Sequence, residues 1–224
     1  MTTSGTATLE FDVNEILQEA WERATGGGDL RSGYQLRTAR RSLNLLLLEW
    51  ANQGLNLFTI EEFTIPLVQG QAIYALPEDT VDLIEHVVRQ NSGINQTDRV
   101  VTRMSVSTYA TLSNKNIVGI PNQIYINRQS EPKITLYPIP QSNDYTLICW
   151  RLRRIQDAVT GGNTMDMPFR FVPALIAGVA YKISQKVPEG TQRMIILEKM
   201  YRDAWDDAAA EDRDRASVRL VPGR

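Results

Sequence analysis

The stretch L-R-T-A-R-R-S-L-N-L-L-L-L-E-W, from Leu36 to Trp50, decides how the rest of the chain is interpreted. Its apolar residues recur at steps of three and four, as on one face of an α-helix. Arginines occupy the other side of its first turns, but Leu45 and Leu48 add apolar side chains to that side near its end. We therefore predict a central helix that begins on a surface and ends in an interior, packed between a helix and a sheet.

Further helices are predicted at both ends of the chain. Asp12 is placed to cap a helix, with Glu15 as its capping-box partner, and the glycines from Gly26 end that helix. Met167 and Pro168 open a later helix. A last helix runs from Ile195 to about Arg215, and its first half is amphipathic. The apolar residues assigned to that last helix are Ile196, Leu197, Met200, Tyr201, Ala204 and Trp205.

Between these helices, from Leu55 to about Ile155, the apolar pattern changes to the alternation typical of β-strands. Gln69 to Gln71 is interpreted as a hairpin turn that joins two of the strands. The segments 124–127 and 133–137 are expected to pair, and 145–152 is a long final strand. The middle of the chain is therefore predicted to be a module of short antiparallel strands.

These segments predict an α+β fold, in which a layer of helices from both termini carries an inserted antiparallel β module and an extended C-terminal tail. The expected division is a flexible N-terminus (1–10), a helical domain (11–54 and 168–210), a β module (55–167) and a C-terminal arm (211–224). Composition alone leaves two interpretations of the arm open, a frayed terminus or a docking arm that becomes ordered on a partner.

Composition narrows the class of protein. Of 224 residues, 42% are hydrophobic and 22% are charged, which is ordinary for a globular protein. The net charge of −2 gives no global attraction to nucleic acid or to an anionic membrane. No apolar run approaches the length of a membrane span, the N-terminus lacks the pattern of a secretory signal, and Cys149 is the single cysteine. We expect a protein that folds in a reducing cytoplasm.

No group of residues predicts catalysis or a cofactor or metal site. His86, the single histidine, lies in a strand-like run beside Glu85, and neighbours in a strand point to opposite faces. We interpret His86 as structural or on the surface, and Cys149 as a buried, inert thiol. The triplet 26–28 lacks the flanking strand and Lys-Ser/Thr of a phosphate loop and is interpreted as a turn. An enzyme with a site at Asp79, Asp82 and Glu85 is the weakest hypothesis, because nothing else converges on them.

Two arginine clusters leave a nucleic-acid-binding module open as an alternative function. One cluster lies on the helix and the other at the end of the long strand; their members are Arg37, Arg40 and Arg41, and Arg151, Arg153 and Arg154. Solvated side chains or ion pairs with neighbouring acids are the favoured interpretation at this net charge.

Several stretches of the chain resemble one protein family in combination. They are E-W-A-N-Q-G-L-N-L-F-T-I from Glu49, Y-A-L-P from Tyr74, G-I-P-N-Q-I-Y-I-N from Gly119, I-T-L-Y-P-I-P from Ile134, Y-T-L-I-C-W from Tyr145, P-F-R-F-V-P-A-L-I-A-G-V-A-Y from Pro168 and E-D-R-D-R-A-S from Glu211. Over residues 11 to 224 the order of these segments resembles the head-to-tail adaptors of tailed bacteriophages, which include tail accessory factors and tail tubular A proteins.

The resemblance implies a structural virion protein without enzymatic activity, located at the head-tail junction. Such adaptors form a ring, usually of twelve copies, under the portal protein, where they extend the DNA channel and carry the next tail or nozzle protein. By resemblance, the C-terminal arm contacts the portal through Asp212, Arg213, Arg215, Val218, Arg219 and Leu220. A ring needs side-to-side contacts between different surfaces, and a mixed-sign helix surface can supply complementary charges for them. A DNA conduit should not bind DNA tightly, which suits a mildly acidic chain.

Overall fold

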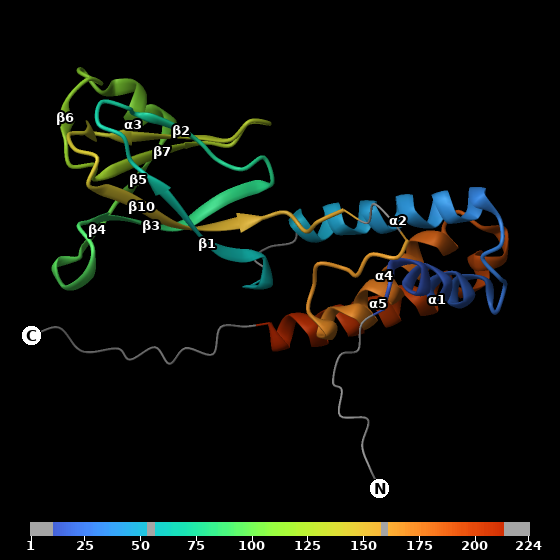
Figure 1. The fold of residues 1–224 in the computed structure, drawn as a ribbon. Helices are drawn as coiled ribbons and strands as arrows, with labels where there is room; N and C mark the ends of the chain where they lie inside the picture. Colours follow the sequence, from blue (N-terminus) through green and yellow to red (C-terminus); the bar gives the residue numbers. More distant parts are fainter. Residues whose placement is uncertain (1–10, 53–56, 158–160, 213–224) are drawn as a thin grey trace, which may run out of the picture. The chain divides into compact units, whose positions relative to one another are not determined.

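The computed structural model describes residues 11–52, 57–157 and 161–212 (Figure 1). The chain divides into two compact units. The helical unit combines Met1–Phe58 with Ile155–Arg224, and the β unit is the continuous segment Thr59–Arg154. The chain therefore has a mixed α+β composition, with an internal segment forming the β unit.

Four helices of more than two turns build the helical unit, together with two short 3-10 segments, Phe169–Phe171 and Pro188–Arg193. The four are α1 (Val13–Thr25), α2 (Gly33–Asn52), α4 (Val172–Ser184) and α5 (Met194–Glu211). The predicted capping box is confirmed, since the Asp12 carboxylate accepts from Glu15 N at 2.7 Å and Asp12 N donates to the Glu15 carboxylate at 3.0 Å. Gly26, with φ of 80°, ends α1 in the left-handed conformation that glycine favours.

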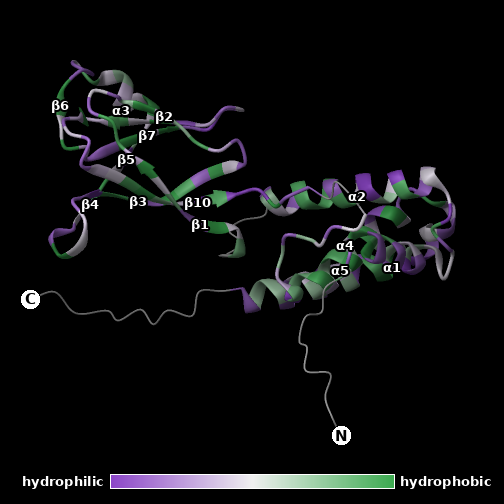
Figure 2. Cartoon of the chain, viewed as in Figure 1, coloured by the Kyte–Doolittle hydropathy of each residue, from purple (hydrophilic) through white to green (hydrophobic). Residues whose placement is uncertain are grey.

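The centre of the helical unit is α4, and the prediction that α2 is the central helix is wrong. α4 contacts α1, α2 and α5, and nine of its 13 residues are buried. Its sequence V-P-A-L-I-A-G-V-A-Y is small or apolar on nearly all sides, as its largely green ribbon shows in Figure 2. Gly178 permits the close packing, because a Cβ there would lie 2.6 Å from Leu46 Cδ2.

An aromatic cluster packs where α2, α4 and α5 meet. The ring of Trp50 lies 4.7 Å from that of Trp205, measured between centroids, and 6.1 Å from that of Phe171. Trp50 is fully buried, and its Nε1–H donates to the Tyr201 hydroxyl at 2.8 Å. Its bulk and its one polar atom are therefore both accommodated.

The second side of α2 is not in an interior in this chain. Leu45 is 47% exposed and Leu48 is 55% exposed, although the predicted apolar stripe from Ala39 to Trp50 is buried. The expectation that the end of α2 is enclosed all round is therefore wrong for the single chain. Two large aliphatic side chains remain accessible on an ordered helix.

Two four-stranded sheets and one two-stranded pair build the β unit. The sheet orders are β1-β10-β3-β4 and β2-β8-β7-β5, and β6 pairs with β9. The bounds are β1 Ile60–Pro66, β2 Ile73–Ala75, β3 Thr80–Gln90, β4 Thr97–Val100, β5 Thr102–Met104, β6 Val118–Gly119, β7 Gln123–Asn127, β8 Lys133–Tyr137, β9 Ile139–Pro140 and β10 Tyr145–Arg153. Short helical segments occur at Leu57–Thr59, Gly93–Asn95 and α3, Val106–Thr111.

The strand pairing differs from the expected antiparallel module in two respects. β1 and β2 do not form a hairpin, because β1 pairs with β10 and β2 pairs with β8. The pairs β5–β7 and β6–β9 are parallel. The expected pairing of β7 with β8 is confirmed. Strands of two or three residues have too few alternating side chains to predict their partners. The longest pairing is between β3 and β10.

The segment that links β10 to α4 belongs to the helical unit, whereas the sequence analysis placed residues 155–167 in the β module. Backbone bonds explain the difference. Val13 N donates to Asn163 O at 3.0 Å, and Asn14 N donates to Gly161 O at 3.0 Å, so this segment is held on the start of α1. Ile155 is also buried in the helical core.

Candidate functional site

Asp212 is the one residue of the expected portal contact that lies within the described part of the chain. It follows α5, its side chain is 4% exposed, and its carboxylate accepts from Arg170, just before α4. The backbone N–H of Asp212 donates to Ala208 O at 3.0 Å. The end of α5 is therefore fixed to the helical unit at the residue from which the arm continues.

The remaining residues of that contact, Arg213, Arg215, Val218, Arg219 and Leu220, lie outside the described residues. The role of the arm consequently stays a prediction. The structure adds that its starting point is a buried, ion-paired position rather than an exposed helix end.

The arginine cluster of β10 is engaged by acids within the β unit, as the favoured interpretation expected. The Arg151 side chain is 8% exposed and forms ion pairs with Asp79, at 2.6 Å, and with Glu61. Arg153 pairs with the same Glu61 at 3.1 Å, and Arg154 donates to the Glu78 carbonyl oxygen. Phosphate binding would have to displace these carboxylates, so the cluster is a poor nucleic-acid site.

The arginine cluster of α2 is more accessible. Arg37 and Arg41 are exposed, and within the described ranges neither forms an ion pair. Arg40 is half-buried, and its Nε has no hydrogen-bond partner among the described residues. Burial and the charges of Arg41 and Lys182 lower the pKa of nearby Lys186, as expected where positive charge is only partly balanced.

The acids considered for an enzyme site are divided among different partners. Burial opposes ionisation of Asp79, but the hydrogen bond and charge of Arg151 outweigh it and lower the Asp79 pKa. Asp82 pairs with Arg103 at 3.0 Å and with Arg128 at 2.9 Å. Glu85 is exposed. Asp79 and Asp82 therefore stabilise the β unit through ion pairs with arginines and do not form an acid–base pair with Glu85.

The single histidine and the single cysteine are buried on strands. His86 is 7% exposed, and neither ring nitrogen has a hydrogen-bond partner in the described part of the chain. Burial lowers its pKa, and Glu85 lies on the exposed face, as the strand geometry predicted. Cys149 Sγ donates to the Phe63 carbonyl oxygen at 3.2 Å, and burial raises its pKa to about 11, which confirms an inert thiol.

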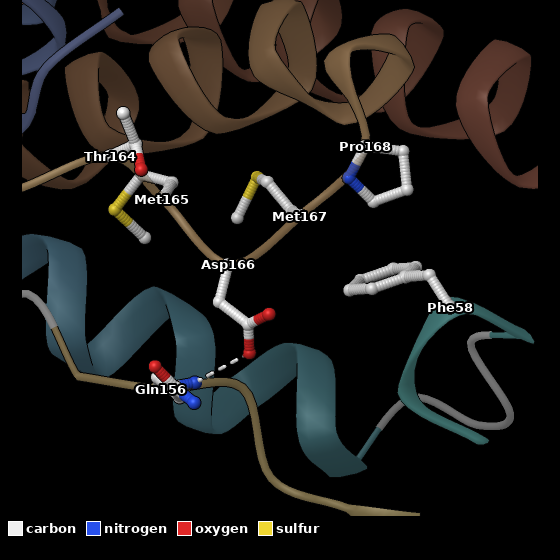
Figure 3. Close-up of a pocket in the computed structure, with 7 residues that line it drawn as sticks. All are labelled: Phe58, Gln156, Thr164, Met165, Asp166, Met167 and Pro168. Atoms are coloured by element: carbon white, nitrogen blue, oxygen red, sulfur yellow. Dashed lines mark hydrogen bonds between the residues drawn. The ribbon is translucent and has the colours of Figure 1, made fainter. Parts of the chain in front are cut away.

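A pocket of about 500 Å³ opens on the helical unit beside the segment that precedes α4 (Figure 3). Its lining residues are Phe58, Gln156, Thr164, Met165, Asp166, Met167 and Pro168. In Figure 3 Asp166 points toward Gln156, whose backbone N–H donates to it at 3.3 Å. Asp166 is the single carboxylate among these lining residues, and none of them is a histidine, cysteine or lysine, so the pocket does not define a catalytic site.

The described residues contain neither a cluster of metal-ligating side chains nor a membrane-spanning helix. Among residues 11–52, 57–157 and 161–212, no group of three or more His, Cys, Asp or Glu side chains is placed to hold a metal ion. Within the same ranges, no helix has the length and apolar character that crossing a membrane requires.

The buried face of α5 differs from the one that its sequence predicts. Ile196 and Met200 were expected in its buried stripe, but they are 63% and 45% exposed, and neighbouring Ile195 is 77% exposed. The buried or half-buried face runs through Leu197, Tyr201, Ala204, Trp205 and Ala208 instead. Those steps of four, three, one and three residues leave Ile196 and Met200 off the face, a signal already present in the sequence.

Comparison with known proteins identifies the class. The family model described as SU10 adaptor protein matches residues 11–223, nearly the whole chain. The chain belongs to the SU10 adaptor protein family. This confirms the predicted membership of the phage head-to-tail adaptors, which are structural proteins of the virion.

No curated protein matches the chain. One matching solved structure is described as the neck of an empty GTA particle computed with C6 symmetry. The match has 10% sequence identity and a TM-score of 0.29, and it covers 97% of this chain and 100% of the other. At that TM-score it carries no argument about the fold.

Proposed function

We propose that this protein forms a ring, with the twelve copies usual for such adaptors, between the portal protein and the next tail or nozzle protein. There it extends the channel through which DNA passes. The observation that carries this proposal is the adaptor-family match over residues 11–223. The role is structural and needs no enzymatic activity, cofactor or metal. Its location is the head-tail junction of the virion, after folding in the host cytoplasm.

The C-terminal arm, residues 211–224, is proposed to bind the portal. The buried pairing of Asp212 with Arg170 supports this, because it fixes where the arm leaves the helical unit. Of the six residues that the family resemblance implies, Asp212 is buried against Arg170 and anchors the arm. The proposed portal contacts are the other five, Arg213, Arg215, Val218, Arg219 and Leu220. An arm whose ordering is coupled to the portal would restrict ring closure to the portal vertex, since only there is the cost of ordering it compensated.

The alternative, a nucleic-acid-binding module, is less well supported. Arg151 and Arg153 are bound to carboxylates, so one of its two clusters is engaged in the β unit. The exposed pair on α2, Arg37 and Arg41, is too small to give strong phosphate binding at a net charge of −2. DNA passing through the ring is therefore proposed to make no specific contacts.

The first test is the mass, by light scattering on a sizing column, of this protein mixed with the portal ring of the same virus. We expect a complex that carries a ring's worth of copies. Deletion of residues 217–224 should weaken portal binding at least about tenfold while circular dichroism stays unchanged. Deletion of residues 2–8, a segment of similar length at the other end, is the matched control and should bind normally.

Two outcomes would count against this proposal. If the full-length protein elutes beside an undecorated portal, the adaptor contact with the portal is wrong. If the 217–224 deletion binds as well as the full-length protein, the ring proposal stands but the arm is not the portal contact.

A further inference from the structure

The outer faces of α2 and α5 carry complementary patterns. On α2, the exposed stripe is basic in its first half, at Arg37 and Arg41, and apolar in its second half, at Leu45 and Leu48. On α5 the order is reversed. Its exposed stripe is apolar first, at Ile196 and Met200, and acidic afterwards, at Asp203, Asp206 and Asp207.

The spacing of the two stripes also matches. Leu48, Arg41, Arg37 and Tyr34 are separated by steps of seven, four and three residues toward the start of α2. Ile196, Asp203, Asp207 and Ala210 are separated by the same steps toward the end of α5. At 1.5 Å per residue, the apolar and charged halves of each stripe lie about 10 Å apart. Two helices with these intervals match when they run antiparallel.

We propose that α2 of one copy packs antiparallel against α5 of the next copy, so that these stripes form the side-to-side contact of the ring. Leu48 then meets Ile196, Leu45 lies beside Met200, and each exposed arginine faces an aspartate, Arg41 with Asp203 and Arg37 with Asp207. The exposed Tyr34 covers Ala210. This inference rests on the proposed ring, and it names the surfaces that would close it.

Other pairings of the same stripes fit worse. A parallel α2–α5 pair would place Arg37 and Arg41 on Ile196 and Met200, which buries charge against apolar groups. Two copies of α2 would bring arginines together or set them against leucines, and two copies of α5 would do the same with aspartates. Only the antiparallel α2–α5 pair satisfies both halves. A contact between two different surfaces propagates from copy to copy and closes where the rotation permits.

In the described part of the chain, neither stripe is covered by another element of its own helical unit. Both α2 and α5 contact α4 through their buried faces, and they border the helical unit in the view of Figure 1. Among the described residues, Arg41, Asp203 and Asp207 form no ion pair. Lys199, exposed between the two halves of the α5 stripe, can lay its aliphatic stem on Leu45 and keep its ammonium group in water.

Cysteine pairs test the register directly in the full-length protein. The double variant Leu48→Cys with Ile196→Cys should form a ladder of disulfide-linked oligomers on a non-reducing gel after mild oxidation, both at high protein concentration and on the portal ring. The native Cys149 is buried and should not contribute. The control pair, Tyr34→Cys with Ile196→Cys, places its thiols at opposite ends of the antiparallel contact and should give a ladder at least about tenfold weaker.

Charge exchange tests the complementarity. In the Leu48→Cys, Ile196→Cys background, Arg37→Asp with Arg41→Asp should reduce the ladder about tenfold or more, because like charges then face each other. Asp203→Arg with Asp207→Arg should do the same. All four changes together restore opposite charges and should restore the ladder. Restoration distinguishes a contact between copies from loss of fold, which circular dichroism checks independently.

The outcomes separate this inference from the proposed function. A ladder without portal binding supports the α2–α5 contact and contradicts the portal role. If the unmodified protein binds the portal but the Leu48→Cys, Ile196→Cys variant forms no ladder, the α2–α5 contact is wrong and the adaptor role stands. The same holds if the control pair gives an equal ladder. If the charge changes reduce portal binding of single copies but the four-fold exchange restores nothing, these faces bind the portal rather than another copy, and the inference is wrong.

Discussion

The strands of the β unit and the outer stripes of α2 and α5 differ in where their charges find partners. In the β unit, Arg151 is enclosed by Glu61 and Asp79, and Asp82 bridges two further arginines. On the outer stripes of the helical unit, Arg41 and Asp203 form no ion pair in the part of the chain that the structure describes. Charges satisfied inside a unit stabilise its fold, whereas charges left on an ordered helix beside exposed leucines are available to another molecule.

The largest expected effect is on the core of the helical unit. Trp50→Ala should lower the free energy of unfolding of that unit by ~3–5 kcal/mol, because it removes a fully buried ring and leaves the Tyr201 hydroxyl without its donor. Hydrogen exchange should show lost protection in α2, α4 and α5 but unchanged protection in β3 and β10. An equal loss of protection in both units would show that they unfold together, and their stabilities could then not be compared separately.

The control for Trp50→Ala is Leu48→Ala, two residues away on the same helix. Leu48 is 55% exposed, so the change should alter the free energy of unfolding of the single chain by less than ~0.5 kcal/mol. A larger loss would mean that Leu48 is already covered within its own chain.

A smaller effect is expected in the β unit. Arg151→Met should cost ~2–3 kcal/mol in chemical denaturation, because it leaves Glu61 and Asp79 without their buried partner. This is below the value for a fully buried pair, since those acids are 41% and 44% exposed. Arg89→Met, which breaks the pair between Arg89 and Asp98 on the surface, should cost clearly less, because Arg89 is 35% exposed and solvent screens its charge. Equal costs would refute the distinction between enclosed and surface pairs.

The smallest expected effect is a pH dependence from His86. Its folded pKa lies below the ordinary value of 6.5 because burial disfavours the charged ring, and the charge of Arg103 lowers this pKa further. The charges of Glu85 and Asp82 oppose the shift without cancelling it. Below pH 6.5 the unfolded chain binds a proton that the folded chain does not, so stability falls as the pH drops toward the folded pKa. This loss accumulates between pH 6.5 and the folded pKa.

His86→Leu should remove that part of the pH dependence, as denaturant titrations at pH 7.5 and 5.5 would show. Because His86 is the only histidine in the sequence, the difference between the two proteins reports on this ring alone. If the variant loses as much stability between pH 7.5 and 5.5 as the original protein does, the His86 imidazole does not contribute to the pH dependence.

The helices were predicted well from the sequence because their signals are local. The Asp12–Glu15 capping box, the buried stripe of α2 and the apolar α4 all follow from spacing. The strand partners were not predictable in the same way. β2 has three residues and β6 and β9 have two each, so their alternation cannot select between neighbours or directions.

The candidate site shows a similar division. The strand positions of His86 and Cys149 predicted buried, inert side chains, and the favoured ion-pair interpretation of Arg151 is confirmed. The outer stripe of α5 is not predicted, because the sequence pattern assigns Ile196 and Met200 to the core of that helix. Apolar character alone does not distinguish a residue that packs inside its own chain from one that packs on a neighbour.

The ends of the β unit lie side by side, since β1 and β10 pair along their whole length and Ile60 is opposite Leu152. Paired residues of antiparallel strands are only about 5 Å apart, so the β unit begins and ends at almost the same point. Such a junction permits exchange of the whole inserted segment without rebuilding the helical core.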